Sequence, residues 1–392
     1  MKILSIETSC DETAISLVEA AGEFPNAKYE ILGNALFSQI DIHREYGGVF
    51  PAVAKREHAK TLVPMLEKAL MEAGELQGGG EAAAFETIRV ILEREPGLFE
   101  QLSVFAEKYQ KPNIDLIAVT AGPGLEPTLW VGVNFAKALA LLWNVPVVGV
   151  NHMEGHVLAS IFDAERDDML ADISFPTISL LISGGHTELI LMKDWSHYEK
   201  IGQTRDDAVG EAFDKVARLL GIPYPGGPEV SKKANEARKL KLPAFADLPR
   251  PMIKSGDLDF SFSGLKTAVL YAVKDKELTN NDRLALCRDF EDAVAEVLVR
   301  KVKDAIAKHN AKTLIVGGGV AGNQYIKREI ETALLHEFPD VTTYFPAPGL
   351  STDNSIMIAL SGHANHERKL TPQGSGIILA NGNRSLSEES NS

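Results

Sequence analysis

The chain has 392 residues, which is long enough for two domains or for one duplicated domain. Apolar residues make up 45% of it and charged residues 24%, which is the composition of an ordinary globular protein and excludes a disordered or fibrous one. A net charge of −14 argues against indiscriminate binding to nucleic acid, so any RNA contact has to come from a local basic patch or be shared with a partner.

Cysteine usage and the start of the chain favour a reducing, cytoplasmic setting. Cys10 and Cys287 are the only cysteines, and their separation predicts no disulfide framework. The initial run MKILSIETS is too short for a signal peptide. Residues 129–150 are largely apolar, but Asn134 and Lys137 interrupt them, so we expect a buried helix followed by a buried strand rather than a membrane span.

Two segments share one pattern, a β-rich apolar run on each side of a short polar turn. They are residues 2–19 and residues 178–192, and each pattern predicts a β-hairpin. The turns, residues 8–13 and 183–187, consist mostly of small, hydroxyl or acidic residues, and such loops can offer backbone N–H groups to an anion. The repetition predicts a duplicated domain whose two loops face one cleft.

The intervening sequence alternates strands and helices, as an α/β protein does. A strand over 114–120, a helix over about 129–143, a strand over 146–150 and a histidine-bearing helix are expected in that order. Later, a strand over 313–316 leads through three glycines into a helix from about Asn323. A glycine-rich turn between strand and helix lets backbone amides approach a nucleotide, although glycine also occurs there for packing alone.

Three further regions read as additions to this pattern. Residues 75–111 predict a helical hairpin insertion of no readable role. Residues 231–254 hold seven lysines and arginines against two acidic residues, which makes them the best basic patch of an acidic chain, although a charge run is usually a solvated face. Residues 381–392 are polar and are expected to form a flexible tail.

The string NHMEGH places His152 and His156 four residues apart, so on a helix they share one face and can hold one metal ion. Glu154 points away from that face, and the string lacks the Glu directly after the first His that the metalloprotease pattern requires. Two histidines are an incomplete site, and the best third ligand is Asp353 in the run 351–354. Taken alone, such a pair is more often a pair of surface residues.

Read together, ten strings in order resemble the TsaD family, the tRNA N6-adenosine threonylcarbamoyltransferases formerly labelled O-sialoglycoprotein endopeptidases. The resemblance is to the bacterial type and spans nearly the whole chain except the insertion and the tail. The strings are ETSCDET (7–13), GGVFPAVAKREH (47–58), TAGPGL (120–125), NHMEGH (151–156), LISGGHTEL (181–189), DDAVGEAFDKVARLLG (206–221), YPGGP (224–228), DFSFSGLKT (259–267), GGGVAGN (317–323) and STDNS (351–355).

This resemblance implies an α/β fold of the actin-like ATPase, sugar kinase and heat-shock chaperone class, with two duplicated RNase-H-like lobes around a central cleft. Lobe I would comprise residues 1–150 and about 357–380 and carry the insertion at about 75–111. Lobe II would comprise residues 151–356 and hold the nucleotide and metal sites. The implied activity is transfer of the threonylcarbamoyl group from threonylcarbamoyl-AMP to the N6 amine of adenosine 37 in tRNAs that decode ANN codons.

The resemblance also assigns residues. The family's metal ligands match His152, His156 and Asp353, and its substrate contacts match Leu181, Ile182, Ser183, Gly184, Gly185, Asp214, Gly227 and Asn323. Asp11, Glu12 and His186 are weaker catalytic candidates. Purely structural roles remain alternatives for several of them: Gly227 as a turn residue, Asp214 on a solvated helix face, Asp11 and Glu12 as turn residues, and His186 as a loop-stabilising residue.

For cofactors and partners, the resemblance implies one divalent metal ion per chain, with Fe²⁺ preferred over Zn²⁺, and ATP or ADP as a further ligand of the cleft. It implies tRNA as substrate, the inactive paralogue TsaB and the ATPase TsaE as partners, a TsaC-type synthase as the supplier of threonylcarbamoyl-AMP, and no membrane. Two other classes remain in view, namely a metallopeptidase and a non-catalytic actin-like nucleotide-binding scaffold.

Overall fold

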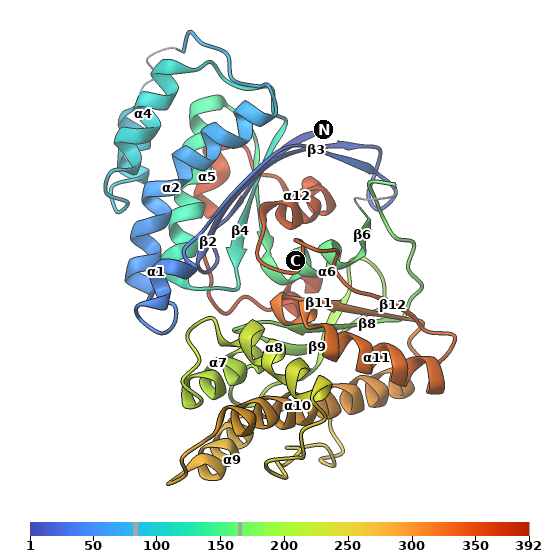
Figure 1. Cartoon of the computed structure of the whole chain (residues 1–392). Helices are drawn as coiled ribbons and strands as arrows, with labels where there is room; N and C mark the ends of the chain where they lie inside the picture. The colour runs from blue at the N-terminus through green and yellow to red at the C-terminus, as the bar shows by residue number, and fades with distance from the viewer. Residues whose placement is uncertain (81–84, 164–166, 392) are drawn as a thin grey trace. The chain divides into compact units, whose positions relative to one another are not determined.

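The computed structural model describes residues 1–80, 85–163 and 167–391. The chain divides into two compact units, which can be followed by colour in Figure 1. The first unit comprises Met1–Ala171 and Asp353–Ser385, and the second comprises Asp172–Thr352 and Leu386–Ser392.

A seven-stranded sheet forms the centre of the first unit, with the strand order β5-β4-β1-β2-β3-β7-β6. β1 and β2 are an antiparallel hairpin, and β1, β4 and β5 run parallel to one another. The strands are β1 (Lys2–Glu7), β2 (Glu12–Ala21), β3 (Lys28–Ser38), β4 (Leu116–Gly122), β5 (Val147–Asn151), β6 (Phe162–Asp163) and β7 (Met169–Leu170).

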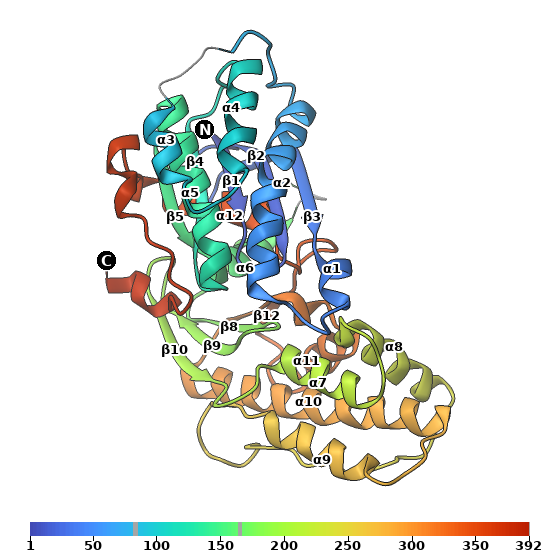
Figure 2. The same ribbon diagram turned by 90° about the vertical axis from the view of Figure 1, so that its left-hand side faces the viewer.

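Helices cover both faces of this sheet, as Figures 1 and 2 show. On one face α2 and α5 pack beside each other, and on the other α12 packs against β1, β2, β4 and α6. Leu4 and Ile6 of β1 join the cluster under α2 and α5, whereas Ile3 lies beside Gly362 of α12. The helices are α1 (Ile40–Arg44), α2 (Pro51–Glu72), α3 (Glu86–Ile91), α4 (Leu98–Lys108), α5 (Glu126–Trp143), α6 (His152–Ile161) and α12 (Ser355–Ala364), with 3-10 helices η2 (His366–Arg368) and η3 (Pro372–Ile377).

The second unit is built on a five-stranded sheet with the order β10-β9-β8-β11-β12. β8 and β9 form its hairpin, and β11 runs parallel to both β8 and β12. Its strands are β8 (Thr177–Ile182), β9 (Thr187–Met192), β10 (Tyr198–Gln203), β11 (Thr313–Gly317) and β12 (Thr342–Tyr344). Its helices are α7 (Val209–Leu219), α8 (Gly226–Lys239), α9 (Ser263–Val273), α10 (Asn280–His309) and α11 (Gln324–Glu337), with η1 (Gly319–Gly322) and η4 (Leu386–Asn391).

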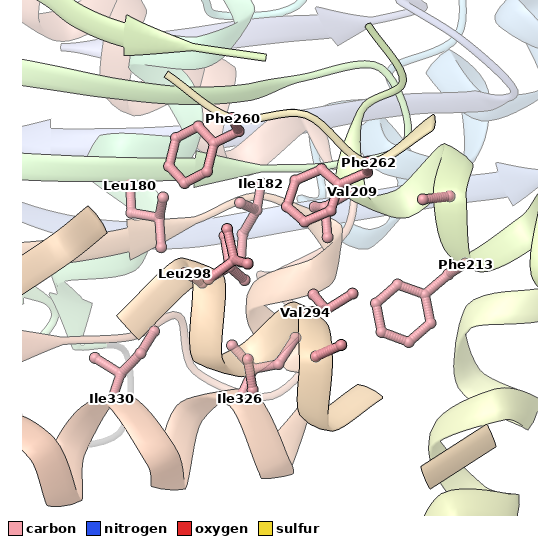
Figure 3. Close-up of a cluster of buried hydrophobic side chains, with 14 of the residues drawn as sticks. Leu180, Ile182, Val209, Phe213, Phe260, Phe262, Val294, Leu298, Ile326 and Ile330 are labelled. Atoms are coloured by element: carbon pink, nitrogen blue, oxygen red, sulfur yellow. The ribbon is translucent and has the colours of Figure 1, made fainter. Parts of the chain in front are cut away.

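A separate apolar core holds the second unit together, and Figure 3 shows part of it. Leu180 and Ile182 of β8 meet Val294 and Leu298 of the long helix α10, and Phe213 of α7 lies with them. The alternation of Leu180 and Ile182 puts both on one face of the sheet, which is why a period-two apolar pattern places them in this core. The β8 strand is therefore fixed rigidly up to the turn that follows it.

The predicted hairpins are confirmed, since Ile6 pairs with Ile15 in one unit and Ile182 pairs with Thr187 in the other. The predicted alternation of strands and helices is confirmed by β4, α5, β5 and α6, and by β11 and α11. The described part of residues 75–111 contains α3 and α4, which pack against α5 and α2.

Two expected boundaries differ from those observed. The first unit continues through Ala171 rather than ending after residue 150, because α6 packs against α12 and β5. The helix that bears the histidines therefore belongs to the first unit. The first unit also resumes at Asp353 rather than at about residue 357. The tail also differs from the flexible segment expected, because Asn381 donates its backbone N–H to Ala121 and Leu386 is buried.

None of the helices described combines the length with the apolar composition that a membrane-crossing helix requires.

Candidate functional site

The two histidines stand at the start of α6, directly after β5. Asn151 ends the strand and caps the helix, accepting a hydrogen bond from the backbone N–H of Met153 at 2.9 Å. The capped start fixes His152 and His156 one turn apart, with their ring centroids 4.7 Å apart and their planes at 85°. Both rings are buried, so the pair is not the pair of surface residues that the alternative interpretation of the motif allowed.

Asp353 begins the C-terminal segment of the first unit and lies beside the two histidines. Its Oδ1 lies 3.2 Å from Nε2 of His156 and 3.4 Å from Nε2 of His152. Asn354, the next residue, caps α12 by accepting from the backbone N–H of Met357 at 3.0 Å, which fixes the carboxylate relative to the helix. One ligand atom from each of the three residues lies within 4.8 Å of the others, a spacing that suits a metal ion.

Glu7 is a fourth member of this cluster that the sequence did not reveal. It ends β1, is fully buried, and its Oε2 lies 3.0 Å from Nδ1 of His152 and accepts from Thr120 Oγ1 at 2.6 Å. Because Nδ1 of His152 faces Glu7, Nε2 is left facing Asp353. A carboxylate that orients a histidine in this way is the usual support of a metal-binding imidazole. The one available signal was an acidic residue at the end of an otherwise apolar strand.

The electrostatics of the cluster follow from burial and from these contacts. Burial disfavours the charged imidazole of His152, but Asp353 and Glu7 outweigh it and raise its pKa well above the usual value. Burial likewise opposes ionisation of Asp353, yet the two imidazoles hold the pKa of its carboxyl well below its usual range. Burial lowers the pKa of His156, whose Nδ1 has no hydrogen-bond partner within the described chain. Two ionised carboxylates, Glu7 and Asp353, thus surround a site for positive charge.

Glu154, between the two histidines, has a different task. Its Oε2 accepts from Asn365 Nδ2 at 2.6 Å and from the hydroxyl of Ser361, and the side chain is buried. Both partners belong to α12 or its C-terminal end, so Glu154 ties α6 to α12. A carboxylate engaged in this way is not placed to activate water beside His152 and His156, which counts against a peptidase.

Asp11 ends the turn of the first hairpin and Glu12 begins β2, in the same unit as His152, His156 and Asp353. Burial and the adjacent Asp11 raise the pKa of Glu12 to about 10. Burial also raises the pKa of Asp11, although hydrogen bonds with Glu12 and Cys10 work against that shift. Glu12 therefore holds its proton at neutral pH.

The corresponding turn of the second unit joins β8 to β9. Ser183 Oγ accepts from the backbone N–H groups of Gly185 at 3.3 Å and His186 at 3.1 Å, and Ser183 N–H donates to the carbonyl of His186. A Cβ on Gly184 or Gly185 would meet no atom within 4 Å, so the turn leaves its backbone open to a close ligand. His186 lies at the end of this turn and belongs to the second unit, whereas His152, His156 and Asp353 belong to the first.

Leu181 and Ile182, which precede the turn, are fully buried in β8. Their side chains are buried, so neither offers a side-chain contact to a substrate.

Two other expected contacts have their polar atoms engaged within the protein. Asp214 Oδ1 accepts from the backbone N–H of Gly226 at 2.7 Å and so holds the start of α8, where Gly227 lies. Asn323 Oδ1 caps α11, and its Nδ2 donates to Glu291 at 2.8 Å. Both residues thus stabilise local structure, and a Cβ on Gly227 would find only Phe213 near, at 3.8 Å.

These elements of the second unit converge at the ends of β8 and β11. The backbone N–H of Gly210, in α7, donates to the Ser183 carbonyl at 3.1 Å. A Cβ on Gly318 would come within 2.5 Å of the Ile182 carbonyl, and its φ of +90° also favours glycine. The glycine turn after β11 therefore lies against the turn after β8, at the carboxyl edge where α/β sheets bind ligands.

Comparison with known proteins decides the family. A family model described as TsaD, tRNA N6-adenosine threonylcarbamoyltransferase, matches residues 30–104 and 98–360. The tRNA N6-adenosine threonylcarbamoyltransferase of Burkholderia multivorans is 42% identical over 369 residues, covering 92% of this chain and 91% of that protein. The enzyme of the same name from Burkholderia cenocepacia is 41% identical over the same shares.

The chain belongs to the TsaD family.

The solved structures agree on the fold. A HypF from T. kodakarensis matches with a TM-score of 0.53 at 12% identity, over 94% of this chain and 48% of that chain. A full-length HypF in a phosphate- and nucleotide-bound form matches with a TM-score of 0.51 at 13% identity, over 93% of this chain and 46% of that one. The chain spans about half the length of these HypF chains. The expected fold class, that of actin-like ATPases and sugar kinases, is confirmed for this TsaD family member.

Proposed function

We propose that this protein transfers the threonylcarbamoyl group from threonylcarbamoyl-AMP to the N6 amine of adenosine 37 in tRNAs that decode ANN codons. Membership of the TsaD family supports the activity. The observation that carries the assignment to this chain is the convergence of His152, His156 and Asp353, two of them separated from the third by about half of the sequence. A non-catalytic scaffold has no need of a buried ligand set of this kind.

The reaction needs an acceptor for one proton. The N6 nitrogen attacks the carbamoyl carbon, a C–N bond forms, the C–O bond to the phosphate breaks, and AMP leaves with the electron pair. The attacking amine loses a proton, and the carboxylate of Asp11, next to Glu12 at the start of β2, is the proposed acceptor.

The metal ion is proposed to bind His152, His156 and Asp353, with Glu7 orienting the first of them. Two imidazoles and one carboxylate suit Fe²⁺ and also Zn²⁺, and we propose Fe²⁺ as the resident ion. When bound, it would supply a positive charge that polarises an oxygen of the substrate. The buried position of both histidines and the negative charge of Glu7 and Asp353 fit such an ion.

The nucleotide is proposed to bind the second unit. The phosphate is proposed to approach the Ser183–Gly185 turn at Gly184, where no atom would obstruct it. Gly227 and Asn323 lie on segments that would border the ribose and adenine. Asp214 would act by holding the α8 start rather than by contacting ligand, because its Oδ1 already accepts from Gly226. ATP or ADP would use the same turns, since they present the same phosphate chemistry.

Partners follow from the family alone. TsaB and TsaE are proposed to assemble with this chain, and a TsaC-type synthase is proposed to supply threonylcarbamoyl-AMP.

The test is reconstitution with threonylcarbamoyl-AMP, unmodified tRNA and the partner proteins, with the nucleosides analysed by mass spectrometry. The modified adenosine should form with wild-type protein. Asp353→Ala should lose most bound metal and most activity while keeping its fold, because the carboxylate is a ligand rather than part of the apolar core. A folded, complete mixture that yields no product where a Burkholderia relative succeeds would refute the function. Wild-type metal content in Asp353→Ala would refute the ligand assignment alone.

A further inference from the structure

Tyr46 and Phe50 form an exposed aromatic pair on the loop between α1 and α2. Their ring centroids are 5.9 Å apart and their planes differ by 22°, so the rings are stacked. Tyr46 is 57% exposed and Phe50 52% exposed. Large aromatic side chains usually bury most of their surface, and a contiguous exposed apolar patch is a candidate interaction site.

The protein holds this pair in place. His43, fully buried, accepts the backbone N–H of Phe50 on Nδ1 at 3.3 Å, and its carbonyl accepts from the N–H groups of Tyr46 and Gly48. Its Nε2 lies 3.2 Å from Oε1 of Gln39. Three backbone N–H groups gathered on one buried residue fix the loop, so the rings are preorganised and a ligand would lose little ordering entropy in meeting them.

The segment that carries the pair is also hydrogen-bonded to the residues around Asp11 and Glu12. The backbone N–H of Gln39 donates to the Asp11 carbonyl at 2.9 Å, and Ser38 Oγ donates to Glu12 at 3.2 Å. At the other end of the segment, His58 of α2 contacts the Cys10 carbonyl through Nε2 at 3.0 Å. The α1–α2 segment is thus attached on both sides to the Cys10–Glu12 turn, within one unit.

The start of α2, beside the pair, favours a phosphate-bearing ligand. Phe50 is the N-cap of the long helix α2, Pro51 is its first residue, and its first turn holds no acidic residue, so the positive end of the helix dipole is unopposed there. Of the basic residues that follow, Arg56 and Lys60 pair with Glu57 at 3.2 and 2.7 Å, which leaves Lys55 as the third. Stacked rings beside a positive helix end are the combination that single-stranded RNA recognition uses.

We propose that Tyr46 and Phe50 form a stacking platform for an unpaired base of the substrate RNA, next to the adenosine that is modified. The proposal rests on the proposed function for the identity of the RNA. Splaying that neighbouring base onto the rings would hold the target adenosine at the Asp11–Glu12 turn.

The experiment measures binding of an unmodified anticodon stem–loop RNA that carries 2-aminopurine beside the target adenosine, with the full chain in the reconstituted mixture. Replacing both rings by leucine keeps apolar bulk and removes the aromatic faces. Y46L/F50L should bind roughly 5- to 100-fold more weakly and lose the fluorescence quenching that stacking causes. The salt dependence of binding should stay the same, because every phosphate keeps its basic partner. Tyr46→Phe, which keeps both aromatic rings, should retain wild-type binding and quenching.

Tyr271→Leu is the matched control, because Tyr271 is also exposed, at 69%, but lies on α9 of the second unit. Binding by Y46L/F50L within twofold of wild type, an equal loss in the Tyr271 variant, or a reduced salt slope would each overturn the platform. Unchanged RNA binding with loss of a protein partner from the mixture would also overturn it, by assigning the surface to a protein. The readout is separate from group transfer. Wild-type protein that quenches the probe through Tyr46 but forms no product would refute the proposed function and not the platform.

Discussion

Nδ1 of His152 lies 3.0 Å from Oε2 of Glu7, which joins the end of β1 to the start of α6. The contact fixes the ring so that its other nitrogen faces Asp353, 3.4 Å away. The ligand set is therefore supported from behind by a strand of the central sheet, and its geometry depends on a residue that touches no ligand atom of Asp353.

Glu7→Gln should weaken metal binding by roughly 10- to 100-fold, because the neutral amide orients the His152 ring less firmly and makes it a poorer ligand. Competition with a chelator of known affinity measures this change. Glu19→Gln, which removes the same charge from β2 of the same sheet, should have no effect. Equal metal affinity in wild-type and Glu7→Gln protein would show that Glu7 has no part in orienting the ligand.

Glu154→Ala should destabilise the protein by roughly 1–3 kcal/mol without loss of bound metal. The reason is that Ser361 and Asn365 lose a buried acceptor, whereas the ligands keep theirs. Denaturant unfolding and elemental analysis together give both quantities. The exposed Glu211 of α7 offers a control, since Glu211→Ala should change stability by less than about 0.5 kcal/mol. Metal loss at unchanged stability would put Glu154 at the metal and reopen the peptidase hypothesis.

Neutralising part of the basic stretch should weaken tRNA binding and flatten its salt dependence. Arg238 and Arg250 are engaged with Glu291 and Glu296, so the lysines are the better targets. The triple change Lys232→Gln, Lys239→Gln and Lys241→Gln should lower the slope of log affinity against log salt by roughly 0.7–0.9 for each phosphate that is no longer neutralised.

The matched triple for that experiment replaces other exposed lysines of the same unit, namely Lys193, Lys308 and Lys312. Its slope should equal the wild-type slope. If the first triple also leaves the slope unchanged, tRNA binds elsewhere.

Acidification should destabilise the first unit through His58. Burial lowers the pKa of His58 to about 4, whereas an unfolded histidine titrates near 6.5. The unfolded chain therefore takes up a proton at a higher pH than the folded one. The stabilisation is complete above about pH 6.5 and is lost as the pH falls toward 4, amounting to roughly 2 kcal/mol between pH 7 and pH 5.

Unfolding in urea at these two pH values tests the His58 prediction. His58→Gln should lose about 2 kcal/mol less than wild type over the same interval, because glutamine does not titrate there. Equal losses in the two proteins would assign the acid sensitivity to other groups.

The sequence predicted the hairpins and helices well, because period-two and period-3.6 apolar patterns act locally and do not depend on distant residues. It also predicted that His152 and His156 share a face, since this follows from helix geometry alone. The partnership with Asp353 needed the family resemblance or the structure, because it depends on α12 returning to the first sheet from 197 residues away.

Other features could not be predicted for identifiable physical reasons. Glu7 looked like any strand-ending acid, since burial of its carboxylate depends on β4 and α6 packing around it. Asp214 and Asn323 looked like ligand contacts, and only the structure shows that their oxygens cap the starts of α8 and α11. The unit boundary was misplaced because α6 follows a complete strand and looks like the start of a new domain, while its packing partner α12 is encoded far downstream.

The order in which the chain visits its two units has a consequence for synthesis. Asp353 opens the last segment of the first unit, after the whole sheet of the second unit has been made. A nascent chain that stops before this point carries both histidines but lacks their carboxylate and the helix that covers β1, β2 and β4. On the proposed assignment, ion uptake becomes possible only when translation is almost finished. Truncated products are then metal-free and keep one face of their first sheet uncovered, which exposes them to proteolytic removal.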